Sequence, residues 1–212
     1  MRHLALVLLL LVVGVTAADD HEHRYGFEKT QVGELPPGWI TAKTGTGNGS
    51  VWKIVAEKEA PGGKALAQTS GEGSGSFFNL CLLEKSTFLN FDATLTFKAV
   101  AGMEDQGGGL LWRCQDADNY YVARCNPLED NYRVYKVVKG RRSAPLGNAK
   151  VTAPTGRWHT MRIVQQGDHI QCYLNGTLHL DVKDDTFKET GKVGFWTKAD
   201  AQTLFADLKI RH

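Results

Sequence analysis

Apolar and polar residues alternate with a period of two along most of this chain, and this alternation is the feature that most constrains its fold. Residues 91–98 read FDATLTFK and residues 170–174 read IQCYL, so alternate side chains in both segments are apolar. Successive side chains of a β-strand point to opposite faces of the sheet, so each segment is typical of a strand with one buried face. No segment longer than a turn or two keeps apolar residues at helical spacing. The sequence therefore predicts an all-β protein.

Turn signals separate the alternating segments at short intervals. The chain has 23 Gly and only 6 Pro, and the Gly fall between β-branched and aromatic runs. Asn175-Gly176 is a type I′ turn dipeptide and predicts a hairpin between residues 170–174 and 178–182. Many short strands with frequent turns predict a jelly-roll sandwich of two antiparallel sheets. Further strands are predicted at residues 51–55, 66–69, 76–82, 110–115, 120–125, 132–138, 159–164, 193–197 and 204–210.

The N-terminal segment has the features of a secretory signal peptide. Residues 2–13 read RHLALVLLLLVV, a basic start followed by an apolar run that is shorter than the about 20 residues of a membrane span. The small residues at 15–17 match a signal peptidase site. We predict that residues 1–17 are removed and that residues 18–212 form one secreted or periplasmic domain with no membrane contact. The alternative is an N-terminal anchor that stays in the membrane.

Charge and motif content exclude several functional classes. The chain carries 25 Lys and Arg against 23 Asp and Glu, so it lacks the basic surface of a nucleic-acid-binding protein. It has no Cys/His spacing for zinc, no phosphate-binding loop and no nucleophile elbow. His21 and His23 are not assigned to a metal site. The alternative there is an amino-terminal copper tripeptide, which requires the mature chain to start at Asp19.

The four cysteines, Cys81, Cys114, Cys125 and Cys172, lie within apolar strand patterns and are typical of small buried hydrophobic residues. A predicted hairpin around residues 116–119 places Cys114 opposite Tyr121 and Cys125 opposite Leu110. The two cysteines then share a face but lie several residues apart along it, too far for a disulfide. We predict no Cys114–Cys125 disulfide, and the spacing leaves the other pairings open.

The same hairpin register predicts which side chains share the other face of the middle segment. Three Arg and two Tyr there are too polar for a core: Arg113, Tyr120, Arg124, Arg133 and Tyr135. Tyr rings stack on sugars, and Arg donates paired hydrogen bonds to hydroxyls or carboxylates. We interpret this face as a glycan-binding platform. The alternative is a solvated outer face with cross-strand polar pairs.

Other residues are predicted at the rim of the platform. Trp196 and Lys198 follow a strand in FWTKAD, and Trp196 is interpreted either as a rim residue or as core. Glu129, Asp130 and Asp200 are predicted rim carboxylates. Carboxylates in turns are mainly turn formers; the alternatives are a glycosidase acid/base pair or ligands of a structural Ca²⁺. The E-x-D-x-x-E strand signature of β-glucanases is absent, and no other cofactor is predicted.

Four stretches together resemble a family of secreted bacterial concanavalin A-like domains, of the laminin-G-like and 3-keto-disaccharide hydrolase kind. They are FEKTQVGELPPGW at residues 27–39, QGGGLLWRCQDADNYYVARCNPLEDNYRVYKVVKGRR at 106–142, GRWHTMRIVQQGDHIQCYLNG at 156–176 and DDTFKETGKVGFWTKADAQTLFADLKI at 184–210. The resemblance implies a concanavalin A-like jelly roll, a carbohydrate partner and, for the hydrolase branch, cleavage of keto-sugar glycosides.

Three functions follow as hypotheses. The Arg/Tyr face favours a non-catalytic carbohydrate-binding module. The family resemblance favours a hydrolase of modified disaccharides or glycosides. The remaining alternative is a structural protein of the cell envelope or matrix. A fold of this kind hosts many activities, so the side chains of the site must decide between them.

Overall fold

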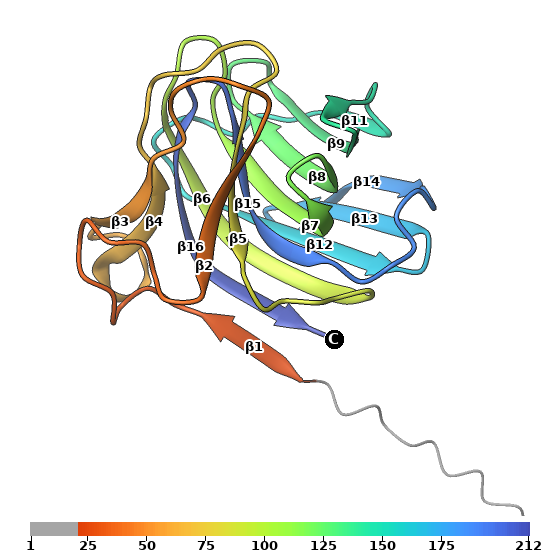
Figure 1. Ribbon diagram of the computed structural model, residues 1–212, viewed down its shortest axis with the longest axis horizontal. Coiled ribbons are helices and arrows are strands. Elements are labelled where there is room, and N and C mark those ends of the chain that lie inside the picture. Colours follow the sequence, from red (N-terminus) through yellow and green to blue (C-terminus); the bar gives the residue numbers. More distant parts are fainter. Residues whose placement is uncertain (1–20) are drawn as a thin grey trace, which may run out of the picture.

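The computed structural model describes residues 21–212, which form two antiparallel β-sheets packed face to face (Figure 1). The predicted signal peptide lies outside the described residues. The helical content of the described region is a single 3-10 turn, η1 (Pro61–Gly63), so no described helix has the length and hydrophobicity needed to cross a membrane. The prediction of an all-β sandwich is confirmed.

The two sheets are called sheet A and sheet B. Sheet A has the strand order β14-β13-β12-β6-β16-β4-β3, with β1 also paired to β16. Its strands are β1 (Glu22–Tyr25), β3 (Trp52–Ala56), β4 (Lys64–Gln68), β6 (Phe91–Ala101), β12 (His159–Gln166), β13 (His169–Leu174), β14 (Thr177–Lys183) and β16 (Gln202–Arg211).

Sheet B has the strand order β10-β9-β8-β7-β15-β5-β2, with β11 also paired to β9. Its strands are β2 (Trp39–Thr44), β5 (Phe78–Leu83), β7 (Gly108–Asp116), β8 (Asn119–Asn126), β9 (Asn131–Val138), β10 (Arg141–Arg142), β11 (Gly147–Lys150) and β15 (Lys192–Lys198). Strands β1, β2, β10 and β11 were not predicted from the alternation.

The core lies between the sheets and is built by the alternate residues that the sequence pattern selected. Phe195 of sheet B stacks on Phe205 of sheet A, with ring centroids 4.5 Å apart, and Trp39 stacks on the same Phe195 at 4.9 Å. The predicted turn at Asn175-Gly176 is confirmed: both residues have positive φ, and Leu174 pairs with Thr177. Positive φ at both central residues is what a type I′ turn requires.

The register predicted for the β7–β8 hairpin is wrong by two residues. Asp116 pairs with Asn119 as predicted, but Trp112 pairs with Tyr121, so a bulge holds two extra residues of β7 between these pairs. Arg113 lies in the bulge with a φ of 45°. The bulge separates Arg113 from the face that carries Arg124 and moves Cys114 onto that face.

The absence of a Cys114–Cys125 disulfide is confirmed, although for a different reason from the one predicted. Cys125 packs in the core between the sheets, whereas Cys114 packs on the outer face of sheet B. All four cysteines, which lie in the described region, are buried free thiols. Burial raises the pKa of the Cys114 and Cys125 thiols to about 12.

Sheet B curls so strongly that its outer face is also buried. Thr44 on the edge strand β2 hydrogen-bonds to Tyr120 on β8 at 2.7 Å, although three strands lie between them in the sheet. A second apolar cluster fills the hollow of the curl. Its buried members are Phe78, Leu80, Leu82, Leu111, Cys114, Tyr120, Val122, Tyr135, Val137 and Trp196.

The loop after β14 is fastened to sheet B by Asp184. Its Oδ1 accepts a hydrogen bond from the Tyr121 hydroxyl at 2.6 Å, and its Oδ2 lies 2.7 Å from Lys136 Nζ. Burial acts to raise the pKa of Asp184, but the bonds from Lys136, Thr186 and Tyr121 outweigh it and lower the pKa to about 2.

The ionised Asp184 therefore stabilises the fold above the pKa of an unfolded Asp, and this contribution is lost as pH falls toward about 2. We expect Asp184→Asn to lower the free energy of unfolding by about 2 kcal/mol near neutral pH and by progressively less between about pH 4 and 2. Urea unfolding across this range measures the difference. The neighbouring, exposed Asp185→Asn is the control, and an equal effect of the two substitutions would contradict the assignment.

Candidate functional site

The structure brings together only some of the predicted platform residues. Arg124 of β8 and Arg133 of β9 are directly paired across the strands, and Tyr135 lies on the same face of sheet B. The expected exposure is wrong for four of them, because Arg113, Tyr120, Arg124 and Tyr135 are buried. The curl of sheet B is the physical reason for Tyr120, Arg124 and Tyr135, since the curl encloses the outer face of the sheet.

Tyr120 and Trp196 belong to the interior of the curl. Trp196 Nε1 donates a hydrogen bond to the Tyr120 hydroxyl at 3.2 Å, and the Trp196 ring packs on Phe78 with centroids 5.1 Å apart. The interpretation of Trp196 as a core residue, rather than a rim residue, is the one that the structure supports. Both side chains lie beneath the surface that a ligand would reach.

Arg113 points to a different part of the molecule. Its guanidinium donates to the backbone carbonyls of Leu89, Gly167 and Phe187 at 2.7–3.0 Å. These carbonyls belong to the segment before β6, the β12–β13 turn and the loop after β14. Arg113 therefore connects three loops and does not lie beside Arg124.

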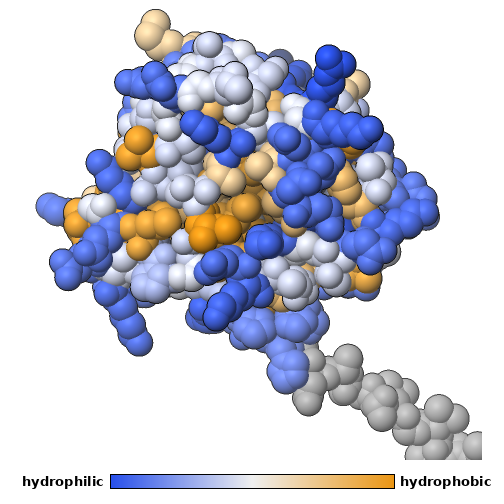
Figure 2. Space-filling model, in the orientation of Figure 1, coloured by the Kyte–Doolittle hydropathy of each residue, from blue (hydrophilic) through white to orange (hydrophobic). Residues whose placement is uncertain are grey.

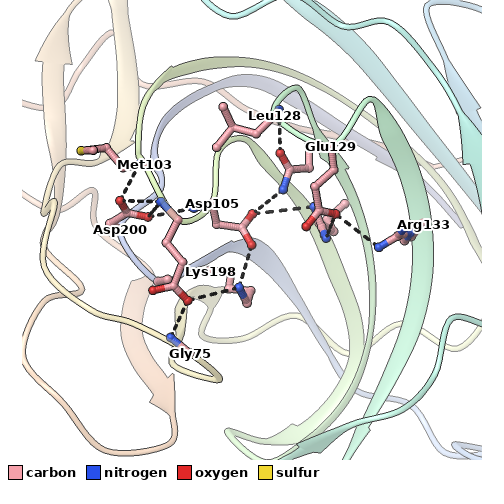
Figure 3. Close-up of polar contacts among 12 residues, drawn as sticks. Gly75, Met103, Asp105, Leu128, Glu129, Arg133, Lys198 and Asp200 are labelled. Carbon is pink, nitrogen blue, oxygen red and sulfur yellow. Dashed lines mark hydrogen bonds and ion pairs between the residues drawn. The ribbon is translucent and has the colours of Figure 1, made fainter.

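Polar side chains gather around Arg124 on the outer face of sheet B. Figure 3 shows Asp105, Glu129, Arg133 and Lys198 among them. We call this set the Arg124 network; it consists of Asp105, Arg124, Asn126, Glu129, Asn131, Arg133 and Lys198. Its members come from the β6–β7 loop, from β8, β9 and the loop between them, and from the end of β15. Sequence-distant elements therefore meet at one place.

Asp105 lies at the buried centre of the network. Its Oδ1 accepts a hydrogen bond from Asn126 Nδ2 at 2.8 Å and lies 3.7 Å from Arg124 Nη1, and its Oδ2 lies 2.9 Å from Lys198 Nζ. Burial raises the pKa of the Asp105 carboxyl, and the neighbouring cations only partly offset this. Lys198, a predicted site residue, thus positions Asp105.

Glu129 forms the exposed part of the network. Its Oε2 accepts hydrogen bonds from Asn131 Nδ2 at 2.7 Å, Arg124 Nη2 at 3.0 Å and Arg133 Nη1 at 3.2 Å. The Glu129 side chain is 44% exposed and that of Arg133 is 30% exposed. Burial acts to raise the pKa of Glu129, but these hydrogen bonds and charges outweigh it and lower the pKa. The site therefore presents a fixed anionic acceptor beside a cationic donor.

The other two predicted carboxylates have backbone roles. Asp200 accepts hydrogen bonds from the backbone N–H groups of Met103, Glu104 and Asp105. It therefore holds the β6–β7 loop in the shape that places Asp105 beside Arg124. Asp130 occupies a positive φ of 49° in the β8–β9 loop and is exposed, so it acts as a turn residue next to Glu129.

Several buried donors near the network lack partners. Among the described residues, Arg124 Nε and Nη1 and Arg142 Nη1 are buried with no hydrogen-bond partner. The Arg142 guanidinium stacks on the Tyr135 ring at 4.5 Å, which places a further cation over the same face. A buried N–H without a partner costs free energy, and these donors are shielded from the surface.

The sequence reasoning missed Asp105, Asn126, Asn131 and Arg142. The dipeptide Glu104-Asp105 stands in a turn, and nothing local indicates that it meets β8 and β15. Asn126 pairs with Asn131 where β8 and β9 enter their connecting loop. Two polar residues that face each other at this point are a sequence signal that the loop is polar. Within the described region, no group of three or more His, Cys, Asp or Glu side chains is placed to hold a metal ion.

The Arg124 network reaches the surface at Glu129 and Arg133. Two recesses of about 360 and 400 Å³ lie elsewhere, one beside Arg113 and the other beside Trp39. Alternating cationic donors and anionic acceptors on such a surface can hydrogen-bond a polar ligand.

The comparisons with known proteins agree with this architecture. The family described as the 3-keto-alpha-glucoside-1,2-lyase-like domain matches residues 34–211, which is most of the described chain. The chain belongs to this family. The recognised resemblance to a concanavalin A-like domain of this type is therefore confirmed. No curated protein has significant sequence similarity to the chain.

Solved structures resemble this 3-keto-alpha-glucoside-1,2-lyase-like domain in fold. The carbohydrate-binding module CBM66 from Bacillus subtilis is 23% identical with a TM-score of 0.65, over 81% of this chain and 94% of that one. Domain 4 of AbnA, an extracellular arabinanase from Geobacillus stearothermophilus solved with arabinotriose, is 14% identical with a TM-score of 0.58, over 89% and 90%. The cellulose induced protein Cip1 is 12% identical with a TM-score of 0.64, over 89% and 96%.

Proposed function

We propose that this protein is a secreted carbohydrate-binding protein that binds a glycan at the Arg124 network. The observation that carries the proposal is the pair formed by Glu129 and Arg133, which is partly exposed and yet fixed by buried neighbours. Sugars present neighbouring hydroxyls, each of which donates and accepts hydrogen bonds. An adjacent carboxylate and guanidinium match two such hydroxyls, and charged groups make the stronger hydrogen bonds.

The rigidity of the pair supports binding. Three donors converge on Glu129 Oε2, and Arg133 Nε donates to Asn148 Oδ1 at 2.7 Å, so both side chains are already oriented. Binding then orders few side chains, which lowers its entropic cost. Arg124 is buried directly beneath the pair and holds Glu129 in place through Nη2.

An exposed apolar side chain lies in the same loop as Glu129. Leu128 is 49% exposed and lies in the same loop, where its backbone N–H donates to Asn126 Oδ1 at 2.9 Å (Figure 3). The C–H face of a sugar ring packs on such a side chain while its hydroxyls reach Glu129 and Arg133. The carbohydrate-binding module and the arabinanase domain share this fold, which adds support from analogy.

Cleavage of a 3-keto glycoside is the second candidate. The observation that favours it is the opposite shift of two nearby carboxylates, with the pKa of Asp105 raised and that of Glu129 lowered. Such pairs serve as acid and base in many enzymes. Asp105, however, is buried and engaged by Asn126, Lys198 and Arg124, which leaves it poorly placed to reach a substrate. Binding without cleavage is therefore the preferred function.

A glycan-array screen of the protein tests the proposal. We expect binding to a defined set of glycans and expect Arg133→Ala to weaken it by at least about tenfold with an unchanged melting temperature, because an exposed ion pair contributes little to stability. Arg162→Ala is the matched control, since Arg162 stacks on Tyr173 at 4.8 Å on sheet A and pairs with Asp92.

The outcomes separate the candidate functions. If the protein releases product from a 3-keto-disaccharide and the Glu129→Gln variant does not, the assigned function changes from binding to catalysis. Absence of binding to any glycan, in a protein that is folded, would contradict the proposal and leave a structural role in the cell envelope or matrix. Equal losses in Arg133→Ala and Arg162→Ala would place the site elsewhere.

A further inference from the structure

Three histidines meet where the two ends of the described chain lie side by side. Strand β1 pairs with β16 in a register that joins Glu22 to Arg211 and His23 to Ile210. One residue beyond Glu22 and Arg211, this register places His21 opposite His212. His21 and His23 are two residues apart on a strand, so their side chains leave the same face. Figure 1 shows β1 alongside the C-terminal end of β16.

The imidazoles of His23 and His212 are in direct contact. Their Nε2 atoms lie 3.0 Å apart, and the ring centroids are separated by 5.1 Å with planes inclined by 11°. The ring of His21 lies 6.4 Å from that of His212. Two imidazole nitrogens that face each other at this distance either share one proton or bind one common cation.

The His23–His212 pair packs against an aromatic ring on one side and borders a recess on the other. The Phe88 ring packs against His212 with centroids 4.9 Å apart and lies 6.3 Å from His23. The pair borders the recess of about 400 Å³ that also contains Tyr25 and Trp39. Figure 2 shows hydrophilic side chains gathered at the end of the molecule where the chain enters β1.

We propose that His23 and His212 chelate a divalent transition-metal ion such as Ni²⁺ or Cu²⁺. Metal–imidazole bonds are about 2.0–2.1 Å, so two nitrogens at adjacent, right-angled positions of one ion lie roughly 3 Å apart. The separation in this structure already has that value, and side-chain rotation is needed only to turn both lone pairs toward the ion. Water completes the coordination around the two imidazole nitrogens.

The chelate also has a structural consequence. It links the first described strand of the domain to the last, and ion binding to the folded state alone raises thermal stability. Imidazole binds a metal ion in its neutral form. The site is independent of the Arg124 network, which lies on sheet B.

Calorimetric titration with Ni²⁺ at about pH 7.5 tests the site in the full-length protein. We expect one ion per chain, with His23→Gln and His212→Gln each weakening binding at least about tenfold and removing the increase in melting temperature. His179→Gln is the control, because His179 lies on β14 and packs on Tyr132.

Two results would overturn the proposal. Nickel binding that survives both substitutions shows that the imidazole pair holds no metal. Binding that is lost only in His21→Gln, with His23→Gln and His212→Gln unaffected, shows that the ion is held at His21 and not by the imidazole pair. Since glycan binding is measured separately, failure of the metal site leaves the proposed function untouched.

Discussion

Replacing Arg113 by alanine is expected to lower the free energy of unfolding by about 3–5 kcal/mol, an effect usually seen in the core. The side chain is 2% exposed and donates four hydrogen bonds to three backbone carbonyls. Hydrogen bonds to a charged group contribute about 1.5–3 kcal/mol each, and these four are partly buried. Urea denaturation followed by tryptophan fluorescence measures the change.

Two variants make the Arg113 result specific. Arg157→Ala removes an exposed arginine and should change stability by no more than about 0.5 kcal/mol. Arg113→Lys keeps the charge but cannot span three carbonyls with one planar fork, so it should recover only part of the loss. If Arg113→Ala is as stable as Arg157→Ala, the three loops are held together without Arg113.

Arg124→Ala is expected to have a similarly large cost, about 3–5 kcal/mol near neutral pH, because it breaks a buried ion pair. Asp105 is 2% exposed and would keep only Lys198 as a charged partner within the network. The same substitution removes the donor that holds Glu129 from below, so glycan binding should also be lost. Chemical denaturation and calorimetric titration of a glycan identified on the array measure the two effects.

A double-mutant cycle separates the ion pair from other consequences of the substitution. Adding Asp105→Asn to Arg124→Ala removes the unpaired charge, so the double variant should be less destabilised than the sum of the two single variants. Additive losses would contradict the pairing of Arg124 with Asp105. Arg124→Lys keeps a cation beside Asp105 but lacks the planar guanidinium. This variant should remain folded but bind glycan at least about tenfold more weakly.

The fold was predictable because one side of most strands faces a core, which imposes the alternation on β6, β12 and β13. The β7 bulge was not predictable from this pattern. On either side of the bulge, the side chains of residues 110–112 and 120–125 alternate between the two faces of the sheet. Only the pairing of β7 with β8 reveals the two extra residues at Arg113. A shift by two residues keeps Leu111 and Trp112 on the faces predicted for them. The bulge interrupts the alternation at Arg113, which has a positive φ, and this interruption displaced Arg113 from its predicted face.

The burial of Tyr120 has a signal in the sequence. Residues 120–125 read YYVARC, which is nearly continuous in apolar residues, as expected of a strand buried on both faces. The Arg and Tyr of such a strand are better explained as enclosed side chains. Asp105 and Lys198 could not be paired from sequence, because they are 93 residues apart and meet only after β15 has packed beside β7.

The most direct test of the proposed function is the crystal structure of the protein with a glycan identified on the array. We expect a sugar ring over Leu128, with hydroxyl oxygens within hydrogen-bond distance of the Glu129 carboxylate and the Arg133 guanidinium. Side-chain movement that opens Arg124 Nε to a ligand oxygen or a bridging water would agree with the same account. A glycan seated instead in the recess beside Arg113 or in the one beside Trp39, with Glu129 and Arg133 unoccupied, would contradict it.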